Sequence, residues 1–141
     1  MDKKALAKKV VKTMYSKDGF SAWLGIRIIK AEPGHCILRM KVRHEMLNGF
    51  GISHGGITYS LADSALAFAS NSHGRKALSI ETSISHTEAL HEGDIITATA
   101  KEVNVSNKIA IYHITVNGKD GAAVAFFKGI VYLTSKEWFP A

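Results

Sequence analysis

The sequence predicts an α+β domain in which one long central helix packs against an antiparallel sheet of five to six strands, with a further helix at the N-terminus. Residues 57–70 contain no Gly or Pro and are rich in Ala, Leu and Ser, which predicts the central helix. From residue 77 onward, alternating apolar residues and short apolar runs are separated by turn sequences, which predicts strands. Because these connections are short, we expect antiparallel neighbours, and 141 residues suit a single domain over residues 1–141.

The first expected element is an amphipathic helix over residues 3–16, because Leu6, Val10 and Met14 recur at every fourth position. Six of the eighteen Lys and Arg residues lie in the first eighteen positions, whereas the rest of the chain holds twelve basic and ten acidic residues. We interpret the basic segment as the solvated face of a packing helix. Contact with a membrane surface or with nucleic acid is the alternative interpretation.

The strands are expected in two groups. Residues 26–30 and 36–42 predict a hairpin whose type II turn has Pro33 and Gly34 as its central pair. After a glycine-rich passage at 48–56, the central helix carries an apolar stripe that should be buried, formed by Ile57, Leu61, Ala65 and Phe68. The remaining strands are expected at residues 78–86, 94–105, 109–117 and 123–134.

Several classes of protein are excluded by composition. No run approaches the ~18–20 apolar residues of a membrane-spanning helix, and no signal-peptide apolar region follows the N-terminal lysines. Cys36 is the only cysteine, so no intrachain disulfide can form, and we expect a cytoplasmic protein. The seven histidines contain no HExxH pattern, and no phosphate-binding loop motif occurs, so we expect neither a metal nor a cofactor.

The residues expected to take part in a reaction lie in the segment from Asn48 to Asp63. Backbone amides in the first turn of a helix lack an intrahelical acceptor, so Gly55 and Gly56 could present N–H groups to an oxyanion. The alternative is that the two glycines serve only a tight turn. Asp63 has mostly apolar or small neighbours three and four residues away, so its carboxylate is expected in a pocket as a general base or nucleophile rather than in open solvent.

The His54-Gly55-Gly56 triplet also resembles the oxyanion loop of lipases and esterases. That fold requires a G-x-S-x-G nucleophile elbow and a much longer chain, and this sequence has neither.

Four motifs around the central helix form a more specific combination. They are Met46-Leu47-Asn48-Gly49, His54-Gly55-Gly56, Leu61-Ala62-Asp63 and Phe68-Ala69-Ser70-Asn71-Ser72. Together they resemble the hotdog-fold thioesterases of the phenylacetic acid degradation type, and the similarity extends over residues 15–134. The resemblance implies a hotdog fold, with the central helix wrapped by the sheet, and hydrolysis of an acyl-CoA thioester. Phenylacetyl-type or other aromatic acyl-CoA is the expected substrate, with medium-chain acyl-CoA as the alternative.

The resemblance also implies roles for individual residues. It makes Asp63 the general base or nucleophile and gives the Gly55 backbone the task of polarising the thioester carbonyl, with His54 and Asn48 supporting that loop and the carbonyl. The residues expected to contact substrate are Gly56, Tyr59 and Ser79. Some relatives place at the position of Ser79 a hydroxyl that helps orient the attacking water and others lack it, so an ordinary strand residue is the alternative for Ser79. Residues 87–90 depart from many relatives, which have an arginine-proline pair there, and Arg75, Lys101 and Lys108 are candidates for the CoA phosphates by charge alone.

Two other functions stay open, a catalytically silent acyl-CoA-binding module and a nucleic-acid-binding protein. A mere binder needs no carboxylate such as Asp63, and the aromatic runs of an RNA-binding strand platform are absent. The spacing of the site also bears on how many chains form it. A helix that begins near Gly55 places Asp63 about 12 Å away at ~1.5 Å per residue, so one carbonyl cannot touch both groups of one chain. Either the two groups do not act together, or the second group comes from another chain. The resemblance favours a second chain, so we expect a homodimer at least, with pairing of dimers into a homotetramer.

Overall fold

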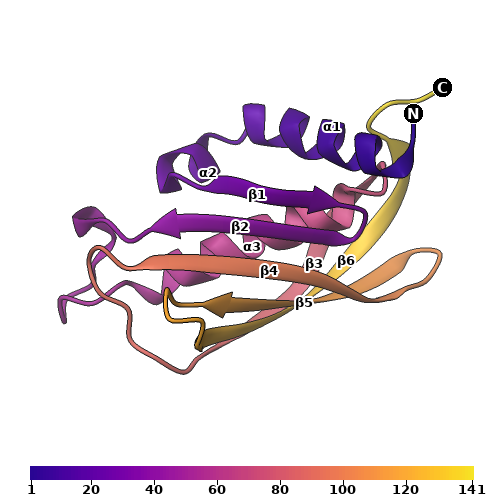
Figure 1. The fold of residues 1–141 in the computed structure, drawn as a ribbon. Helices are drawn as coiled ribbons and strands as arrows, with labels where there is room; N and C mark the ends of the chain where they lie inside the picture. The colour runs from indigo at the N-terminus through magenta and orange to yellow at the C-terminus, as the bar shows by residue number, and fades with distance from the viewer.

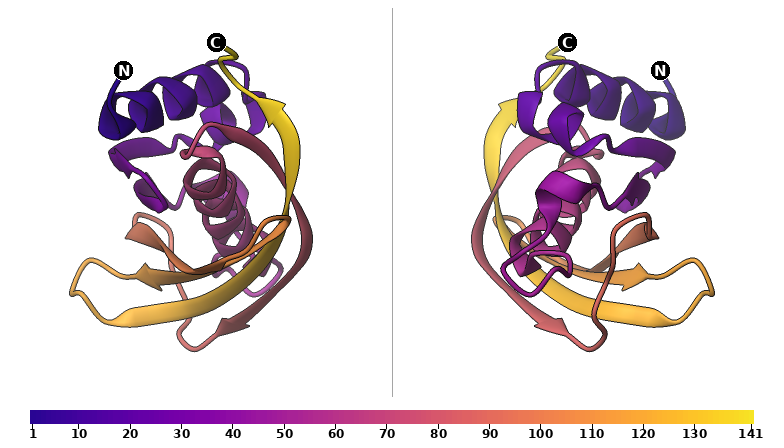
Figure 2. Two further views of the ribbon diagram at one scale, coloured as in Figure 1. Left: turned by 90° about the vertical axis from the view of Figure 1, so that its right-hand side faces the viewer. Right: turned by 90° about the vertical axis from the view of Figure 1, so that its left-hand side faces the viewer.

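The computed structural model describes residues 1–141, and its six-stranded antiparallel sheet curves around one long helix (Figures 1 and 2). The elements are α1 (Lys3–Ser16), α2 (Gly19–Leu24), β1 (Arg27–Glu32), β2 (His35–Lys41), the 3-10 turn η1 (His44–Met46), α3 (Gly55–Asn71), β3 (Arg75–His86), β4 (Ile95–Val105), β5 (Ile109–Asn117) and β6 (Ala123–Glu137). The strand order is β1-β2-β4-β5-β6-β3, so β1 and β3 are the edges. The predicted architecture is confirmed. No helix combines the length and apolar character needed to cross a membrane.

Helix α1 begins and ends where the sequence predicts, and it lies across the open side of the curved sheet (Figure 2). The Asp2 side chain caps it by accepting a hydrogen bond of 2.7 Å from the Ala5 N–H. Ala7, Val10 and Val11 are buried, while the lysines of α1 remain exposed. The apolar stripe therefore packs, as the interpretation of a solvated lysine face requires.

The early hairpin of β1 and β2 is confirmed, and its turn residue Gly34 has a φ of 68°, as the third position of a type II turn requires. The short helix α2 was not predicted, because six residues are too few to show a helical period. Its ends are nevertheless well defined. Asp18 caps the N-terminus by accepting from the Ser21 N–H, and Gly25 ends the helix in the left-handed conformation, with a φ of 74°.

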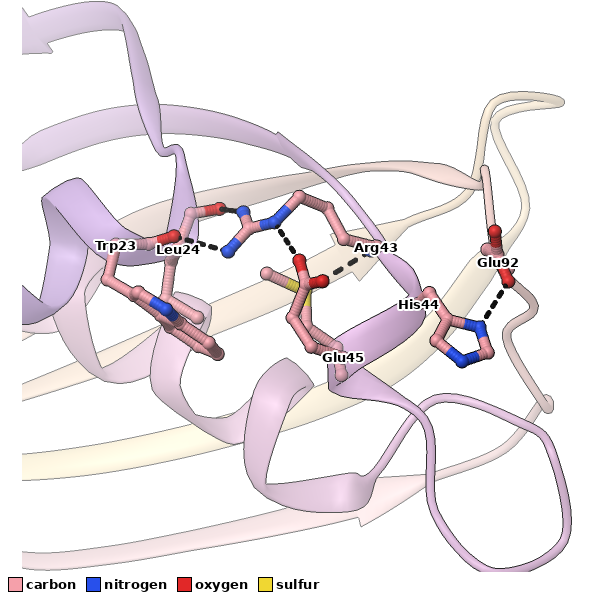
Figure 3. Close-up of polar contacts among 7 residues, drawn as sticks. Trp23, Leu24, Arg43, His44, Glu45 and Glu92 are labelled. Carbon is pink, nitrogen blue, oxygen red and sulfur yellow. Dashed lines mark hydrogen bonds and ion pairs between the residues drawn. The ribbon is translucent and has the colours of Figure 1, made fainter.

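A charged cluster fastens the end of α2 to the chain that leads into α3 (Figure 3). The Arg43 guanidinium donates hydrogen bonds of 2.6 and 3.1 Å to the carbonyl oxygens of Trp23 and Leu24, and it pairs with the Glu45 carboxylate. A cation is favourable at a helix C-terminus, where carbonyls lack intrahelical partners. His44 extends the cluster, since its Nδ1 lies 3.0 Å from Glu92 Oε1 in the β3–β4 loop. The start of the loop before α3 is thereby fastened to both α2 and the β3–β4 loop.

Helix α3 starts two residues earlier than predicted because His54 acts as its N-cap. The predicted stripe of Ile57, Leu61, Ala65 and Phe68 is buried, as expected. The sheet approaches α3 closely at β6, where a methyl group on Gly129 would lie 2.8 Å from Leu66 Cδ1. The absence of a side chain at Gly129 thus leaves the space that Leu66 of α3 occupies.

Replacing Gly129 by alanine tests this contact. We expect Gly129→Ala to lower the free energy of unfolding by ~1–3 kcal/mol, because the added methyl group overlaps the fully buried Leu66 side chain. Urea denaturation at one protein concentration measures the change. Gly19→Ala is the matched control, since a methyl group at Gly19 meets no atom within 4 Å. Equal stability of the two variants would contradict the contact.

Candidate active site

The N-terminus of α3 presents one free backbone amide. His54 Nδ1 accepts a hydrogen bond of 2.8 Å from the Gly56 N–H, so this amide is already engaged. The Gly55 N–H has no acceptor within the chain. The expectation that both glycines could offer their amides to an oxyanion therefore fails for Gly56 and leaves Gly55 as the available donor. It lies at the positive end of the helix dipole.

Asn48 shapes the loop that leads to this amide. Its side-chain oxygen accepts hydrogen bonds from the N–H groups of Phe50 (2.9 Å) and Ile52 (3.3 Å), and its own backbone N–H donates to the Ile52 carbonyl at 2.8 Å. These contacts occupy the acceptor of the side chain but not its Nδ2 donor. Asn48 thus stabilises the loop, and its Nδ2 group remains available to another partner.

An open cleft surrounds Gly55, and two of its residues were not expected from the sequence. The His86 ring packs on Gly55, so that a methyl group on the glycine would lie 3.3 Å from Nε2. Ser53 lines the same cleft, and its hydroxyl is buried without a hydrogen-bond partner. Strand alternation could have located His86, because it shares the face of β3 with Thr82 and Ile84.

Tyr59 lies one turn further along α3 and is held in place by the sheet. Its hydroxyl forms a hydrogen bond with Thr82 Oγ1 on β3, and its ring meets the edge of Phe127 with the centroids 5.4 Å apart. The hydroxyl of Tyr59 is therefore engaged within the chain. The expected substrate contact would have to involve the half-exposed ring.

Asp63 lies a further turn along and is half-buried, with no hydrogen-bond partner in the chain. Burial raises the pKa of its carboxyl above the ordinary value, and the negative charge of Asp18 raises it further. A raised pKa makes the carboxylate a better base, which is the property expected of a general base in a pocket.

Gly55, Tyr59 and Asp63 follow one another at intervals of four residues, and all three are half-buried. They form a stripe along α3, which we call the open stripe. Its two ends are separated by ~12 Å, at the usual ~1.5 Å rise per residue. Within one chain, the free amide and the unpaired carboxylate are therefore not brought together.

The remaining candidates are more scattered. Ser79 lies exposed on the edge strand β3 opposite Val131, and its hydroxyl makes no hydrogen bond within the chain. Arg75 donates to the backbone carbonyls of Asn107, Leu133 and Thr134, so it serves the sheet rather than a free anion site. Lys101 and Lys108 are exposed.

Comparison with known proteins identifies the family. A family described as the thioesterase superfamily matches residues 50–125. The acyl-coenzyme A thioesterase PaaI of Escherichia coli K12 is 36% identical over 116 residues, which cover 82% of this chain and 83% of that protein. The structure of the E. coli PaaI protein superposes with a TM-score of 0.94 at 32% identity, covering 96% of this chain and 99% of that one.

A second structure, smu.793 from Streptococcus mutans bound to acetyl CoA, superposes with a TM-score of 0.77 at 25% identity. It covers 79% of this chain and 90% of that one. The match spans the loop of Gly55 and the helix that carries Asp63, and the sheet wraps that helix as the resemblance implies. This chain is a hotdog-fold member of the thioesterase superfamily and a homologue of PaaI.

Proposed function

We propose that this protein hydrolyses acyl-CoA thioesters to a free acid and CoA in a site shared by two chains. The observation that carries the proposal is the open stripe, which holds a free backbone donor at Gly55 and a carboxylate of raised pKa at Asp63. The names and ligands of the relatives support the substrate class, since one is an acyl-coenzyme A thioesterase and another binds acetyl CoA. We place the reaction in the cytoplasm, in keeping with the single buried thiol of Cys36.

The Gly55 N–H donates a hydrogen bond to the thioester carbonyl oxygen, where negative charge develops as the carbonyl carbon becomes tetrahedral. Asp63 of the partner subunit acts in one of two ways. As a general base it takes a proton from water, whose oxygen then bonds to the carbonyl carbon. As a nucleophile it attacks that carbon itself, and water cleaves the resulting anhydride. In both routes the carbon–sulfur bond breaks and CoA leaves as a thiolate.

The edge strand β3 supports the shared site, because it pairs only with β6 and leaves its other side free. Its side chains Leu78 and Ile80 are 65% and 60% exposed, which is unusual for large apolar residues on an unprotected edge. Two β3 strands paired about a two-fold axis would cover both residues and set the open stripes of two α3 helices against each other. Gly55 of each chain would then face Asp63 of the other.

A homotetramer needs a second interface. The outer face of β6 offers one, since the exposed Phe126 and Tyr132 lie on it. For the acyl group we retain phenylacetyl-type or other aromatic acids, with medium-chain acids as the alternative. A thiol-release assay over a panel of acyl-CoA substrates distinguishes these classes.

Asp63→Asn tests the catalytic assignment. The amide cannot accept a proton or attack a carbonyl, so we expect kcat to fall by ~10²–10⁴-fold, the usual contribution of a general base. Thiol release from the best acyl-CoA measures the loss, with circular dichroism and binding of CoA as controls for the fold and the pocket. Activity within threefold of the wild type would exclude Asp63 as the reacting group.

The same substitution should raise the stability of the protein at neutral pH, although it removes activity. Because the pKa of Asp63 is raised in the folded protein, its protonated form favours folding, and this stabilisation is lost as pH rises through the folded-state pKa. We expect Asp63→Asn to have a higher Tm than the wild type at neutral pH. The difference should shrink as pH approaches the ordinary value of 3.8. A pH-independent difference in calorimetry would contradict the raised pKa.

Mixing two inactive variants tests the shared site. Gly55→Val adds a side chain beside His86 that obstructs the approach of the carbonyl, and Asp63→Asn removes the base. A heterodimer of the two keeps one site with both groups intact, so co-refolding equal amounts should restore about a quarter of the wild-type activity. Each variant alone is the control. Absence of recovery in a mixture shown by mass spectrometry to contain heterodimers would exclude a site shared in this way.

A further inference from the structure

A chain of hydrogen bonds ties α2 to the turn of α3 that carries Asp63. Asp18 Oδ1 accepts the Ser21 N–H at 2.9 Å, and Asp18 Oδ2 accepts the Ser21 hydroxyl at 2.6 Å. The Ser21 Oγ lies 2.8 Å from the Ser64 Oγ, and Ser64 directly follows Asp63. Two hydrogen bonds thus connect the Asp18 carboxylate to the Ser64 side chain on α3.

The direction of this chain follows from its protons. A serine hydroxyl has one proton to donate, and that of Ser21 goes to Asp18, so the Ser64 hydroxyl must donate to Ser21. Both hydroxyls are buried, since Ser21 is 0% and Ser64 is 9% exposed. A serine within a helix commonly bonds back to a carbonyl of its own helix, whereas Ser64 reaches a different helix. The contact therefore fixes where the Asp18 charge sits relative to α3.

After burial, the negative charge of Asp18 is the second cause that raises the pKa of Asp63. The neighbours of Asp63 on α3 are uncharged. A like charge in this place opposes ionisation of Asp63. Capping α2 does not require the charge, because Asn and Ser cap a helix about as well as Asp. The negative charge at Asp18 thus has an effect that its capping role does not explain.

We propose that Asp18 is a positioning residue of the active site, whose negative charge, held in place by Ser21 and Ser64, strengthens Asp63 as a base. This inference rests on the proposed role of Asp63 in thioester hydrolysis. Asp18 itself touches no substrate and acts only through Asp63. The hydroxyl chain keeps α2 from moving the charge away.

The test is the pH dependence of kcat/KM for Asp18→Asn. Asparagine keeps the cap and removes the charge, so the pKa of Asp63 should fall and the acid limb of the profile should move to lower pH. The plateau kcat should fall as well, because the base is weaker, while KM stays near the wild-type value. Asp2→Asn is the matched control, since Asp2 caps α1 in the same way, and its profile should coincide with that of the wild type.

Asp18→Ser provides a second variant that caps α2 without a charge, and it should shift the acid limb in the same direction. An acid limb that stays at the wild-type pH in either folded variant would overturn the proposal, as would an equal shift in Asp2→Asn. Asp63→Asn distinguishes a failure of the proposed function from a failure of the proposed role of Asp18. If it remains active, the proposed function fails. If it is inactive while Asp18→Asn keeps the wild-type acid limb, only the role of Asp18 fails.

Discussion

The burial of α3 within the curved sheet is the constraint on which the rest of the structure depends. Its apolar stripe and small side chains are buried where α3 packs against the strands from β2 to β6, and Gly129 lets the backbone of β6 approach Leu66. The open stripe of Gly55, Tyr59 and Asp63 stays half-buried, as do Ser60 and Ala67, and Gly56 is exposed. We place the proposed site along the open stripe because it carries the free amide of Gly55 and Asp63, the one charged side chain of α3.

The rigidity of that helix then determines the kind of site that can form. A free amide at the first residue and a carboxylate about two turns later are held apart by the helix itself. In the dimer that we propose, two antiparallel copies related by a two-fold axis would bring the Gly55 donor of each chain to the Asp63 carboxylate of the other. The His54 cap contributes by engaging Gly56 and leaving Gly55 free, and Asp18 adds charge at the opposite end.

Most of the fold could be predicted from local sequence, because α1, α3 and the strands have clear periods and turn residues. The bounds of α3 needed the cap at His54, and α2 was too short to show a pattern. The roles of Asp63 and Gly55 were inferred from their motifs and stay predictions, although the structure leaves the Gly55 amide and the Asp63 carboxylate without partners in the chain. Residues that join the site through tertiary contacts were not, because His86 reaches Gly55 only once β3 lies beside α3, and Asp18 reaches Ser64 only through Ser21.

The specific activity of a folded monomer tests the central claim most directly. Ile80→Lys places a charge on the exposed edge strand β3 and should weaken pairing between two chains without disturbing the core. Sedimentation then identifies the concentration at which monomer prevails, and thiol release is measured on the same samples. A shared site predicts that activity falls in step with the dimer fraction and that the folded monomer has none. A folded monomer that turns over acyl-CoA at the wild-type rate would contradict the account.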